Sequence, residues 1–530
     1  MREYVLLGIA LLLMMALLAT LAWRLRIPTP IFLVIGGLLI SVIPGVPHLT
    51  IEPDLIFFVF LPPLLYEAAW FMSWRELWRW RRIVLVLAFG LVILTATAVA
   101  YTAQWLIPGF TLTLGFVLGG IISPPDAVAA TSVLKNVKVP KSMISILEGE
   151  SLINDAASLI VFRFALSSVI TGTIVWQQVA VSFVLVTVMG AVIGLAIAGV
   201  FYAIHRWLPL QPRIGILLTF LAPYLIYLAA EQVHCSGVIA VVSGGLFLSA
   251  HSHRLLQHTE RVQGAAMWAT VIFIINGLVF ILIGLELPVI LEGLEGYSLS
   301  SAISYGLVIS ALVIAVRMGF TLLSSPFTNL VGRFMTVAVR QVGWRGPVIS
   351  GWAGMRGVVS LAAAFSVPLI LPNGSAFPHR PLLLFITFIV ILVTLVVQGL
   401  TLPWLIRLVR PEEPIDRLPE EQQEATINRK LHESALAELS QQYATQLVGN
   451  PLFTDLKSRL ESNLRLTQLT TASTENALLA PYQEALTRLH LVKRNELARL
   501  RKDTDFDEEV LRKIEAQLDL EEEKNDHPMR

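Results

Sequence analysis

Long runs of hydrophobic residues, separated by short polar stretches, fill the first 410 positions of the chain. A helix needs about 20 apolar residues to cross the ~30 Å hydrocarbon core of a bilayer. Thirteen runs approach this length, at 4–23, 29–44, 54–71, 83–106, 112–134, 142–169, 179–204, 213–231, 236–250, 265–287, 300–323, 346–371 and 382–406. The pattern predicts an all-α polytopic membrane protein with about 13 transmembrane helices. A signal peptide is the alternative for the first run, which is long for one and lacks a clean cleavage site.

The polar stretches between the runs alternate in charge. Loops after odd-numbered runs hold sixteen basic residues, whereas loops after even-numbered runs hold only Arg380. The sixteen are Arg24, Arg26, Arg75, Arg79, Arg81, Arg82, Lys135, Lys138, Lys141, Arg206, Arg213, Arg254, Arg261, Arg333, Arg340 and Arg345. Because basic loops stay in the cytoplasm, the pattern predicts an N-terminus outside and a C-terminal tail in the cytoplasm.

The composition changes after residue 410. Residues 411–530 hold 24 of the 38 acidic and 16 of the 39 basic residues, although the whole chain is 55% hydrophobic and only 15% charged. Soluble domains average about 25% charged residues, so a water-soluble enzyme of this size is excluded. We predict a transmembrane domain at 1–410 and a cytoplasmic helical domain at 411–530, which acts in packing or dimerisation or, alternatively, as a sensor. The single cysteine, Cys235, excludes an intrachain disulfide and a cysteine-based metal site.

Acidic residues are rare inside the apolar runs, and most of them cluster in the fifth and sixth. An ionisable group at the bilayer centre costs at least ~2.5–3.5 kcal/mol, so each needs a partner or a function. The fifth run is interrupted by Ser123-Pro124-Pro125-Asp126. Two prolines exclude a regular helix, and such a break is tolerated only beside a cavity or under protein. The carbonyls freed by the break and the Asp126 carboxylate are therefore candidate cation ligands, with a bare kink as the alternative.

The sixth run carries Glu150, Ser151, Asn154 and Asp155. Helical spacing places Ser151 and Asp155 on one face, and Glu150 and Asn154 on another turned by about 100°. The first face offers oxygen ligands that suit a monovalent cation, and the second offers a carboxylate for a basic partner. The alternative is that Asp155 pairs with a nearby arginine while Ser151 and Asn154 join helices.

The twelfth run contains a second break, Gly351-Trp352-Ala353-Gly354-Met355-Arg356-Gly357. Broken helices 5 and 12 lie seven runs apart, which is the spacing of two inverted repeats around a midplane binding site. Arg356 needs an acidic partner, and Glu150 is the predicted one. Arg317 is another buried cation, to which we assign the stabilisation of a helix end. Glu67, after Pro62-Pro63, is predicted either to reach the same cavity or to lie at its cytoplasmic mouth.

These motifs resemble those of the cation/proton antiporter-1 family, the NhaP- and NHE-type sodium/proton exchangers, and most closely its YjcE-like bacterial members. The resemblance is carried by residues 123–128 (SPPDAV) and 149–156 (GESLINDA), and continues through 236–237, 277–284 and 354–357. It spans nearly all of the membrane body, but it does not cover the tail. One position departs from the family, because Pro125 stands where threonine is frequent, so only a backbone carbonyl can act as a ligand there.

The resemblance implies a homodimer in the bacterial inner membrane, in which a core domain moves against a dimer domain. Asp155 would be the carboxylate shared by cation and proton, with Asp126 and Ser151 as further cation ligands and Asn154 steadying the site. Glu150 and Arg356 would form a structural ion pair, and Glu67 would be a further site residue. The resemblance implies no cofactor and no nucleic-acid partner. The transported ions would be H⁺ and Na⁺, with Li⁺ and K⁺ as alternatives.

The acids and breaks together predict a secondary transporter rather than an enzyme. A buried carboxylate is costly to leave charged and empty, so it is expected to cross the membrane with either a proton or a cation, in electroneutral 1:1 exchange if only Asp155 titrates. A cation channel with a cytoplasmic gating domain is the alternative, but no run offers a continuous polar pore. Metalloprotease and hydrolase motifs are absent from the sequence. An anion carrier would favour basic site residues over this acidic cluster.

Overall fold

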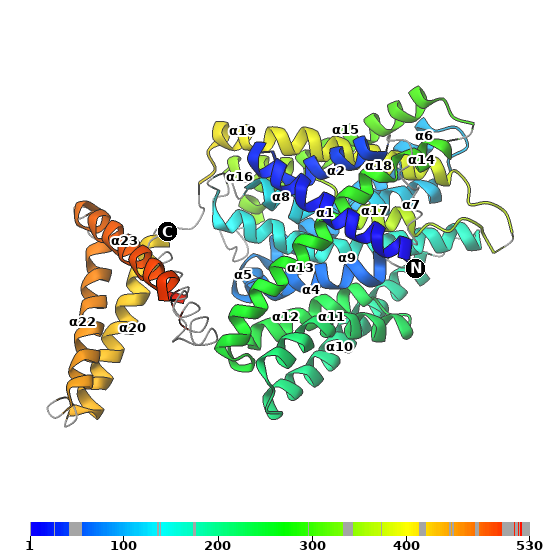
Figure 1. The fold of residues 1–530 in the computed structure, drawn as a ribbon. Helices are drawn as coiled ribbons and strands as arrows, with labels where there is room; N and C mark the ends of the chain where they lie inside the picture. Colours follow the sequence, from blue (N-terminus) through cyan, green and yellow to red (C-terminus); the bar gives the residue numbers. More distant parts are fainter. Residues whose placement is uncertain are drawn as a thin grey trace. The chain divides into compact units, whose positions relative to one another are not determined.

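The structure is a computed structural model in which every named element is a helix (Figure 1). It describes residues 2–25, 27–41, 56–134, 137, 139–172, 176–294, 296–331, 343–372, 374–412, 420–444, 447, 450–471, 476–500, 514, 518, 520 and 521. The chain divides into two compact units, Met1–Pro414 and Ile415–Arg530. The division falls four residues after the start of the predicted C-terminal domain.

The first unit follows the predicted runs. Its helices are α1 (Arg2–Leu25), α2 (Thr29–Ser41), η1 (Ile56–Phe60), α4 (Leu61–Phe71), α5 (Trp74–Leu85), η2 (Val86–Leu91), α6 (Val92–Leu106), α7 (Leu112–Ile122), α8 (Ala127–Leu134), α9 (Lys141–Thr171), α10 (Trp176–Trp207), α11 (Pro212–Gln232), α12 (Gly237–Leu255), α13 (His258–Leu285), α14 (Leu287–Glu292), α15 (Leu299–Val331), α16 (Arg345–Trp352), α17 (Val358–Phe365), α18 (Arg380–Val393), η3 (Thr394–Gln398) and α19 (Gly399–Val409). Within the described residues, nine helical stretches are long and apolar enough to span a membrane, and two shorter apolar helices accompany them. Within the described residues, every predicted run corresponds to one helix or to successive helical segments, and positions 42–44 and 54–55 of the second and third runs lie outside them. This confirms the helical membrane fold, while the exact number of crossings stays a prediction.

Both predicted helix breaks are present. The fifth run forms α7 and α8, separated at Ser123–Asp126, and the twelfth forms α16 and α17, separated at 353–357. The first break follows from Pro124 and Pro125, which cannot donate the backbone hydrogen bonds that a continuous helix needs. The second break falls in the segment that holds Gly354 and Gly357, and contacts described below require both glycines.

Small residues hold α7 tightly between two neighbours. A Cβ on Gly115 or Gly119 would come within 2.6 Å of the backbone of Ala100 or Ala96 on α6. A Cβ on Gly120 would come within 2.8 Å of the Phe162 backbone on α9. Close approach through small residues is the usual way in which membrane helices pack. It fixes the end of α7, and therefore the first break, against α9.

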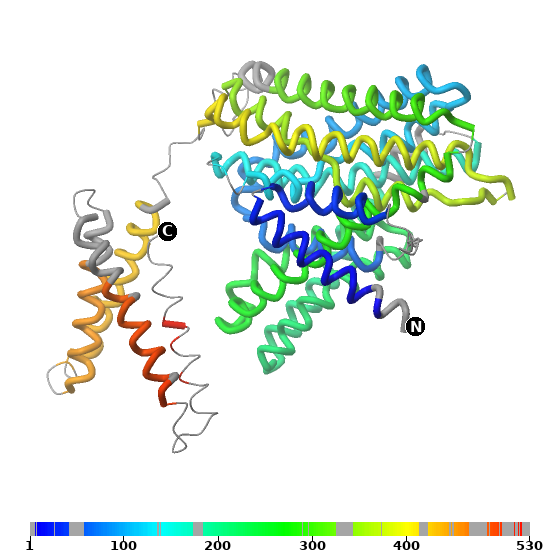
Figure 2. The backbone as a smooth tube through the Cα atoms, turned by 45° about the horizontal axis from the view of Figure 1, so that its top comes forward, coloured from blue at the N-terminus to red at the C-terminus, as the bar shows by residue number. Residues whose placement is uncertain are grey.

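Other helices of the first unit pack in two further groups. α10, α11 and α12 pack on one another and lie side by side in Figure 1. In Figure 2, α1 and α2 lie next to each other, and both pack against α13. The contact between α2 and α13 is close, because Gly37 and Gly284 each leave no room for a Cβ.

The second unit contains α20 (Glu420–Gln442), α22 (Pro451–Thr471) and α23 (Asn476–Leu500). α20 packs against α22, and the rings of Tyr443 and Phe453 meet beside the turn between them at 5.5 Å. Pairs of oppositely charged residues three or four positions apart, such as Asp455 with Arg459 at 2.7 Å, line the exposed helix surfaces. This unit is the helical, charged body that the composition predicts.

Candidate functional site

The two helix breaks meet each other inside the first unit. The backbone N–H of Asp126, at the first break, donates to the carbonyl of Met355, at the second, over 2.7 Å. In return, Nε of Arg356 donates to the carbonyl of Ile122 over 2.9 Å, and its Nη2 donates to that of Ser123 over 3.3 Å. Segments more than 220 residues apart in the sequence therefore satisfy each other's backbone groups.

Arg356 neutralises the end of α7. The last carbonyls of a helix have no partner within it and carry partial negative charge. The fully buried Arg356 side chain donates to two of them, at Ile122 and Ser123, and also to the carbonyl of Gly354. Its own N–H donates to Thr394 Oγ1 over 3.1 Å. The arginine thus pairs with a helix end rather than with a carboxylate.

The predicted Glu150–Arg356 ion pair is therefore wrong. Glu150 pairs instead with Arg317 of α15, with Nη1 to Oε1 at 2.5 Å and Nη2 to Oε2 at 3.0 Å. Both side chains are about 1% exposed. Two parallel hydrogen bonds to one guanidinium occupy both carboxylate oxygens, and the donors of Arg356 are directed at carbonyls. Sequence spacing could not identify the partner, because both arginines are buried cations on distant helices.

Arg317 also stabilises a helix end, as predicted. Its Nε and Nη2 donate to the carbonyl of Ser350, in the last turn of α16, over 3.3 and 3.2 Å. Gly354 lies between the two arginines, since a Cβ there would overlap Arg317 and come within 3.1 Å of Arg356 Nη1. Each of the half-helices α7 and α16 thus has a buried arginine at its negative end.

Asp126 occupies the opposite, positive ends. Its Oδ1 accepts from the N–H groups of Val128 over 2.8 Å and Ala129 over 3.4 Å, in the first turn of α8. The N–H of Val358, the first residue of α17, also donates to this carboxylate. Unpaired N–H groups at two helix starts stabilise a negative charge. These contacts favour the charged form of the Asp126 carboxylate and oppose the cost of burying it.

Gly357 provides the space in which the Asp126 carboxylate lies. A Cβ at position 357 would overlap Oδ2 of Asp126. The residue has φ −151°, a value open to any amino acid, so close approach and not backbone conformation requires glycine here.

We expect Gly357→Ala to displace Asp126 and to lower the free energy of unfolding by about 1–3 kcal/mol, the usual cost of overpacking. Cation-dependent proton movement should fall with it. Thermal unfolding in detergent and a vesicle proton-flux assay would measure the two effects. Gly319→Ala is the matched control, since no atom lies within 4 Å of a Cβ at that position. Equal behaviour of the two variants would contradict the predicted contact.

Ser151 ties α9 to the first break. Its Oγ accepts from the N–H of Ala127 over 3.2 Å and donates to the carbonyl of Pro125 over 3.5 Å. The Pro125 carbonyl is free for such a contact because the helix is broken there. The structure thus brings Ser151, Pro125 and Asp126 together, which the sequence predicted.

Asp155 lies one turn further along α9, and its side chain is 8% exposed. Helical spacing places it on the same face as Ser151, whose Oγ contacts the carbonyl of Pro125 next to Asp126. Among the described residues, no donor is hydrogen-bonded to the Asp155 carboxylate, and the buried arginines are engaged elsewhere. A carboxylate without protein donors, beside a second carboxylate, a hydroxyl and a backbone carbonyl, is a set of oxygen ligands that can bind either a cation or a proton.

The two remaining predicted site residues lie on the same helices as expected. Asn154 is fully buried on α9, and within the described part of the chain neither atom of its amide has a hydrogen-bond partner. Glu67 lies half-buried on α4, which packs mainly against α12 and also touches α9. The roles of both stay predictions.

Sequence reasoning missed Thr394 and Gln398. Thr394 accepts from the backbone of Arg356, and Gln398 is fully buried with no described partner for its amide atoms. Both lie on η3, a π-helical stretch in the thirteenth run. π-Helical segments are frequent at functional sites, but the residue pattern of this run does not predict a π-helix. A polar glutamine in an apolar run was the available signal.

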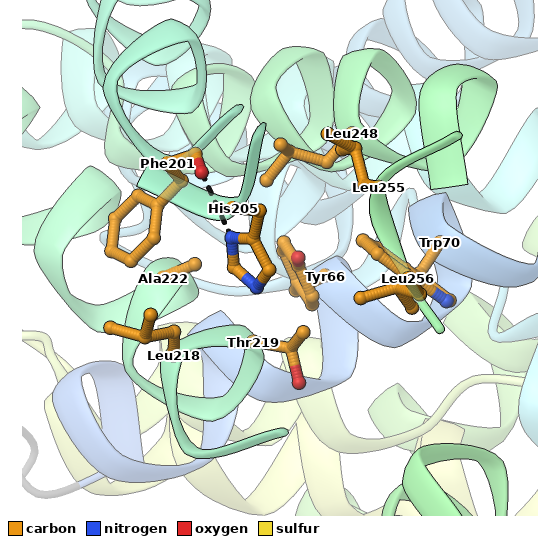
Figure 3. A pocket seen from close by; sticks show the side chains of 10 residues that line it. All are labelled: Tyr66, Trp70, Phe201, His205, Leu218, Thr219, Ala222, Leu248, Leu255 and Leu256. Atoms are coloured by element: carbon orange, nitrogen blue, oxygen red, sulfur yellow. Dashed lines mark hydrogen bonds between the residues drawn. The ribbon is translucent and has the colours of Figure 1, made fainter. Parts of the chain in front are cut away.

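A small cavity lies elsewhere in the unit, between α4, α10, α11 and α12 (Figure 3). Figure 3 shows Tyr66, Trp70, His205 and Thr219 around it among leucine and alanine side chains. Its open volume of about 10 Å³ is enough for one water molecule. None of the predicted site residues lines it, so we do not assign it to the cation site.

Known proteins resemble the chain over most of its length. The family model for the transmembrane sodium/hydrogen exchangers matches residues 9–408. A Na⁺/H⁺ exchanger of Mycobacterium tuberculosis is 31% identical over 507 residues, which cover 94% of this chain and 92% of the relative. The Escherichia coli exchanger YjcE is 31% identical over 521 residues, 93% of each protein. A sodium, potassium, lithium and rubidium/H⁺ antiporter of Bacillus subtilis is 35% identical over 392 residues, 71% of this chain and 57% of the relative.

The fold has a counterpart among solved structures. The sodium proton antiporter MjNhaP1 of Methanocaldococcus jannaschii superposes with a TM-score of 0.59 at 19% identity, covering 77% of this chain and all of that one. At this identity the likeness concerns the fold alone. With a family model that matches three quarters of the chain and relatives that match nearly all of it, the protein belongs to the sodium/hydrogen exchanger family, whose members are cation/proton antiporters and not enzymes.

Proposed function

We propose that the chain exchanges an alkali cation for a proton at Asp155. The observation that carries the proposal is a buried carboxylate that has no described hydrogen-bond donor and lies one helical turn from Ser151, which contacts the Pro125 carbonyl next to Asp126. Such oxygen ligands suit a hard monovalent cation. Asp155, Asp126 and Ser151 would bind the cation together with the Pro125 carbonyl, while Asn154 and Glu67 complete the surroundings.

The buried charges explain why exchange is obligatory. These charges are three acids and two bases at the two helix breaks and on the neighbouring helices α9 and α15, namely Glu150, Asp126, Asp155, Arg317 and Arg356. With all five ionised the sum is −1, and either one proton or one alkali cation brings it to zero. Moving the uncompensated charge through the membrane is costly. The site is therefore expected to cross the membrane with a proton bound or with a cation bound, but not empty.

Only Asp155 is expected to change its protonation during transport. Asp126 accepts hydrogen bonds from N–H groups at two helix starts, and these bonds stabilise its charged form. Asp155 has no such donors among the described residues. One cation then exchanges for one proton, and no net charge moves. The transport cycle is alternating access by two inverted repeats, in which a core domain moves against a dimer domain.

We expect an imposed membrane potential to leave the exchange rate unchanged. Moving one net charge is worth ~2.3 kcal/mol per 100 mV, so an electrogenic cycle would respond strongly to a 100 mV step. Proteoliposomes with a trapped pH dye, clamped at different potentials with valinomycin and graded K⁺, would measure this with Na⁺ as the exchanged cation. A rate that follows the potential would contradict 1:1 exchange.

The range of cations is tested directly by adding Na⁺, Li⁺, K⁺ or Rb⁺ to everted vesicles that contain a pH dye. The relative in Bacillus subtilis is named for all four, and we propose Na⁺ as the principal substrate here, in support of pH and sodium homeostasis. Saturable, cation-dependent fluorescence recovery is the expected result. Its absence with every alkali ion would overturn the proposal.

The topology proposed for the working protein is a homodimer in the bacterial inner membrane, with the N-terminus outside. Residues 1–410 form the antiporter domain, and residues 411–530 form a helical domain in the cytoplasm. The alternation of basic loops supports this orientation. Accessibility of cysteines placed at either terminus of a cysteine-free Cys235→Ala background would test it.

A further inference from the structure

The helical stretch that contains α5 is too long for the membrane core. α5, η2 and α6 form one stretch from Trp74 to Leu106, 33 residues in all. At ~1.5 Å per residue it measures about 50 Å, against ~30 Å of hydrocarbon. Residues 86–106 hold no charged side chain, whereas α5 holds four arginines and one glutamate. The surplus of about 20 Å therefore corresponds to α5, which places this helix at the level of the lipid headgroups.

α5 has two clearly different faces. Leu77, Trp80 and Val84 are buried against the first unit. The opposite face exposes two tryptophans, with Trp74 49% and Trp78 57% exposed, and their rings stack at 5.8 Å. The four arginines beside them, Arg75, Arg79, Arg81 and Arg82, are exposed as well. The guanidinium of Arg81 lies 4.6 Å from the Trp78 ring centre.

We propose that this exposed face of α5 binds the headgroups of anionic phospholipids. Its four arginines and one glutamate carry a net charge of +3, and arginines bind phosphate through paired hydrogen bonds. Tryptophans prefer the boundary between headgroups and acyl chains. A basic amphipathic helix with tryptophans beside its charges is the pattern of a surface that recognises anionic lipid. The arginines thus do more than orient the chain in the membrane.

A lipid bound at the exposed face of α5 would contact a helix whose opposite face packs on α9, the helix that carries the cation site. A Cβ on Gly149 of α9 would come within 3.1 Å of Leu77 Cδ1 and 3.2 Å of a Val84 methyl, so the buried face of α5 lies directly on α9. Gly149 is two residues before Ser151 and six before Asp155. Anionic lipid is therefore expected to support the position of α9 and to raise the transport rate, a consequence that rests on the proposed function.

Lipid binding is measured first, without transport. The full-length protein is purified into nanodiscs of mixed phosphatidylglycerol and phosphatidylcholine, and the lipids that stay bound are counted by native mass spectrometry. The wild type is expected to retain phosphatidylglycerol selectively, and Arg75→Gln/Arg79→Gln to lose about tenfold in this selectivity. Arg429→Gln/Lys430→Gln removes the same charge from α20 in the second unit and is expected to change nothing.

Three results would overturn the lipid surface: equal retention of the two lipids, unchanged selectivity in the α5 variant, or displacement of the lipid by millimolar inorganic phosphate. If the variant does not fold, the salt dependence of lipid selectivity in the wild type provides an additional test. Its selectivity should decrease as the salt concentration rises, because charge pairs at the surface are screened, and salt-independent selectivity would count against the arginines.

Transport in phosphatidylglycerol vesicles, compared with phosphatidylcholine vesicles, measures the effect on α9 separately. A higher rate in the anionic vesicles, lost in the α5 variant, is the expected result. Equal rates would overturn the link from α5 to the site. Since retention of lipid does not require transport, a failure of the proposed function and a failure of the lipid surface are distinguishable.

Discussion

Asp155→Asn is expected to abolish cation-dependent proton release from everted vesicles. The amide can neither bind and release a proton at working pH nor offer a charged ligand to the cation, and within the described residues no second carboxylate replaces it, because Asp126 is held by the N–H groups of α8 and α17. We expect a decrease of at least about a hundredfold, which corresponds to ~2.7 kcal/mol of lost stabilisation. Recovery of a pH dye after addition of Na⁺ measures it.

The matched control for this prediction is Ser158→Ala. Ser158 lies on the same helix and is also buried, but its Oγ donates only to the backbone carbonyl of Asp155, over 3.0 Å. We expect near-normal exchange from it, and a monodisperse elution profile from both variants. Exchange retained in Asp155→Asn would end the assignment of this residue.

Glu150→Gln should destabilise the protein by about 3–5 kcal/mol, because it leaves the charge of Arg317 buried without a counter-charge. Arg317 is fully buried, and its remaining contact is the carbonyl of Ser350. The variant should express poorly or melt early in detergent, as measured by fluorescence-detected size exclusion after heating. Replacing the whole pair, in Glu150→Gln/Arg317→Met, should recover most of the loss, since removing both charges removes the unpaired one.

An exposed ion pair provides the comparison. Arg163 and Glu231 are joined at 2.9 Å, with side chains 45% and 23% exposed. Arg163→Gln should cost no more than about 1 kcal/mol, as is usual for pairs in contact with solvent. A Glu150→Gln protein of normal stability that no longer transports would show that Glu150 acts in the cation site, contrary to the geometry.

Most of the architecture could be predicted from local features of the chain. The apolar runs predict the helices because a membrane helix must be both long and apolar, and Pro124-Pro125 predicts the first break because proline cannot donate in a helix. Helical spacing places Ser151 and Asp155 on one face of α9. A family resemblance then assigned roles that geometry alone had left open.

The sequence by itself thus determined which residues break the helices, which carboxylates lie within the membrane, and that they cluster near one another. Only the tertiary structure decided which partner each charge takes: Arg317 for Glu150, the carbonyls at the end of α7 for Arg356, and the helix starts of α8 and α17 for Asp126. The physical reason is that a buried charge takes whichever opposite charge or dipole is nearest. That distance depends on how α7, α9, α15 and α17 pack, which no local pattern of residues encodes.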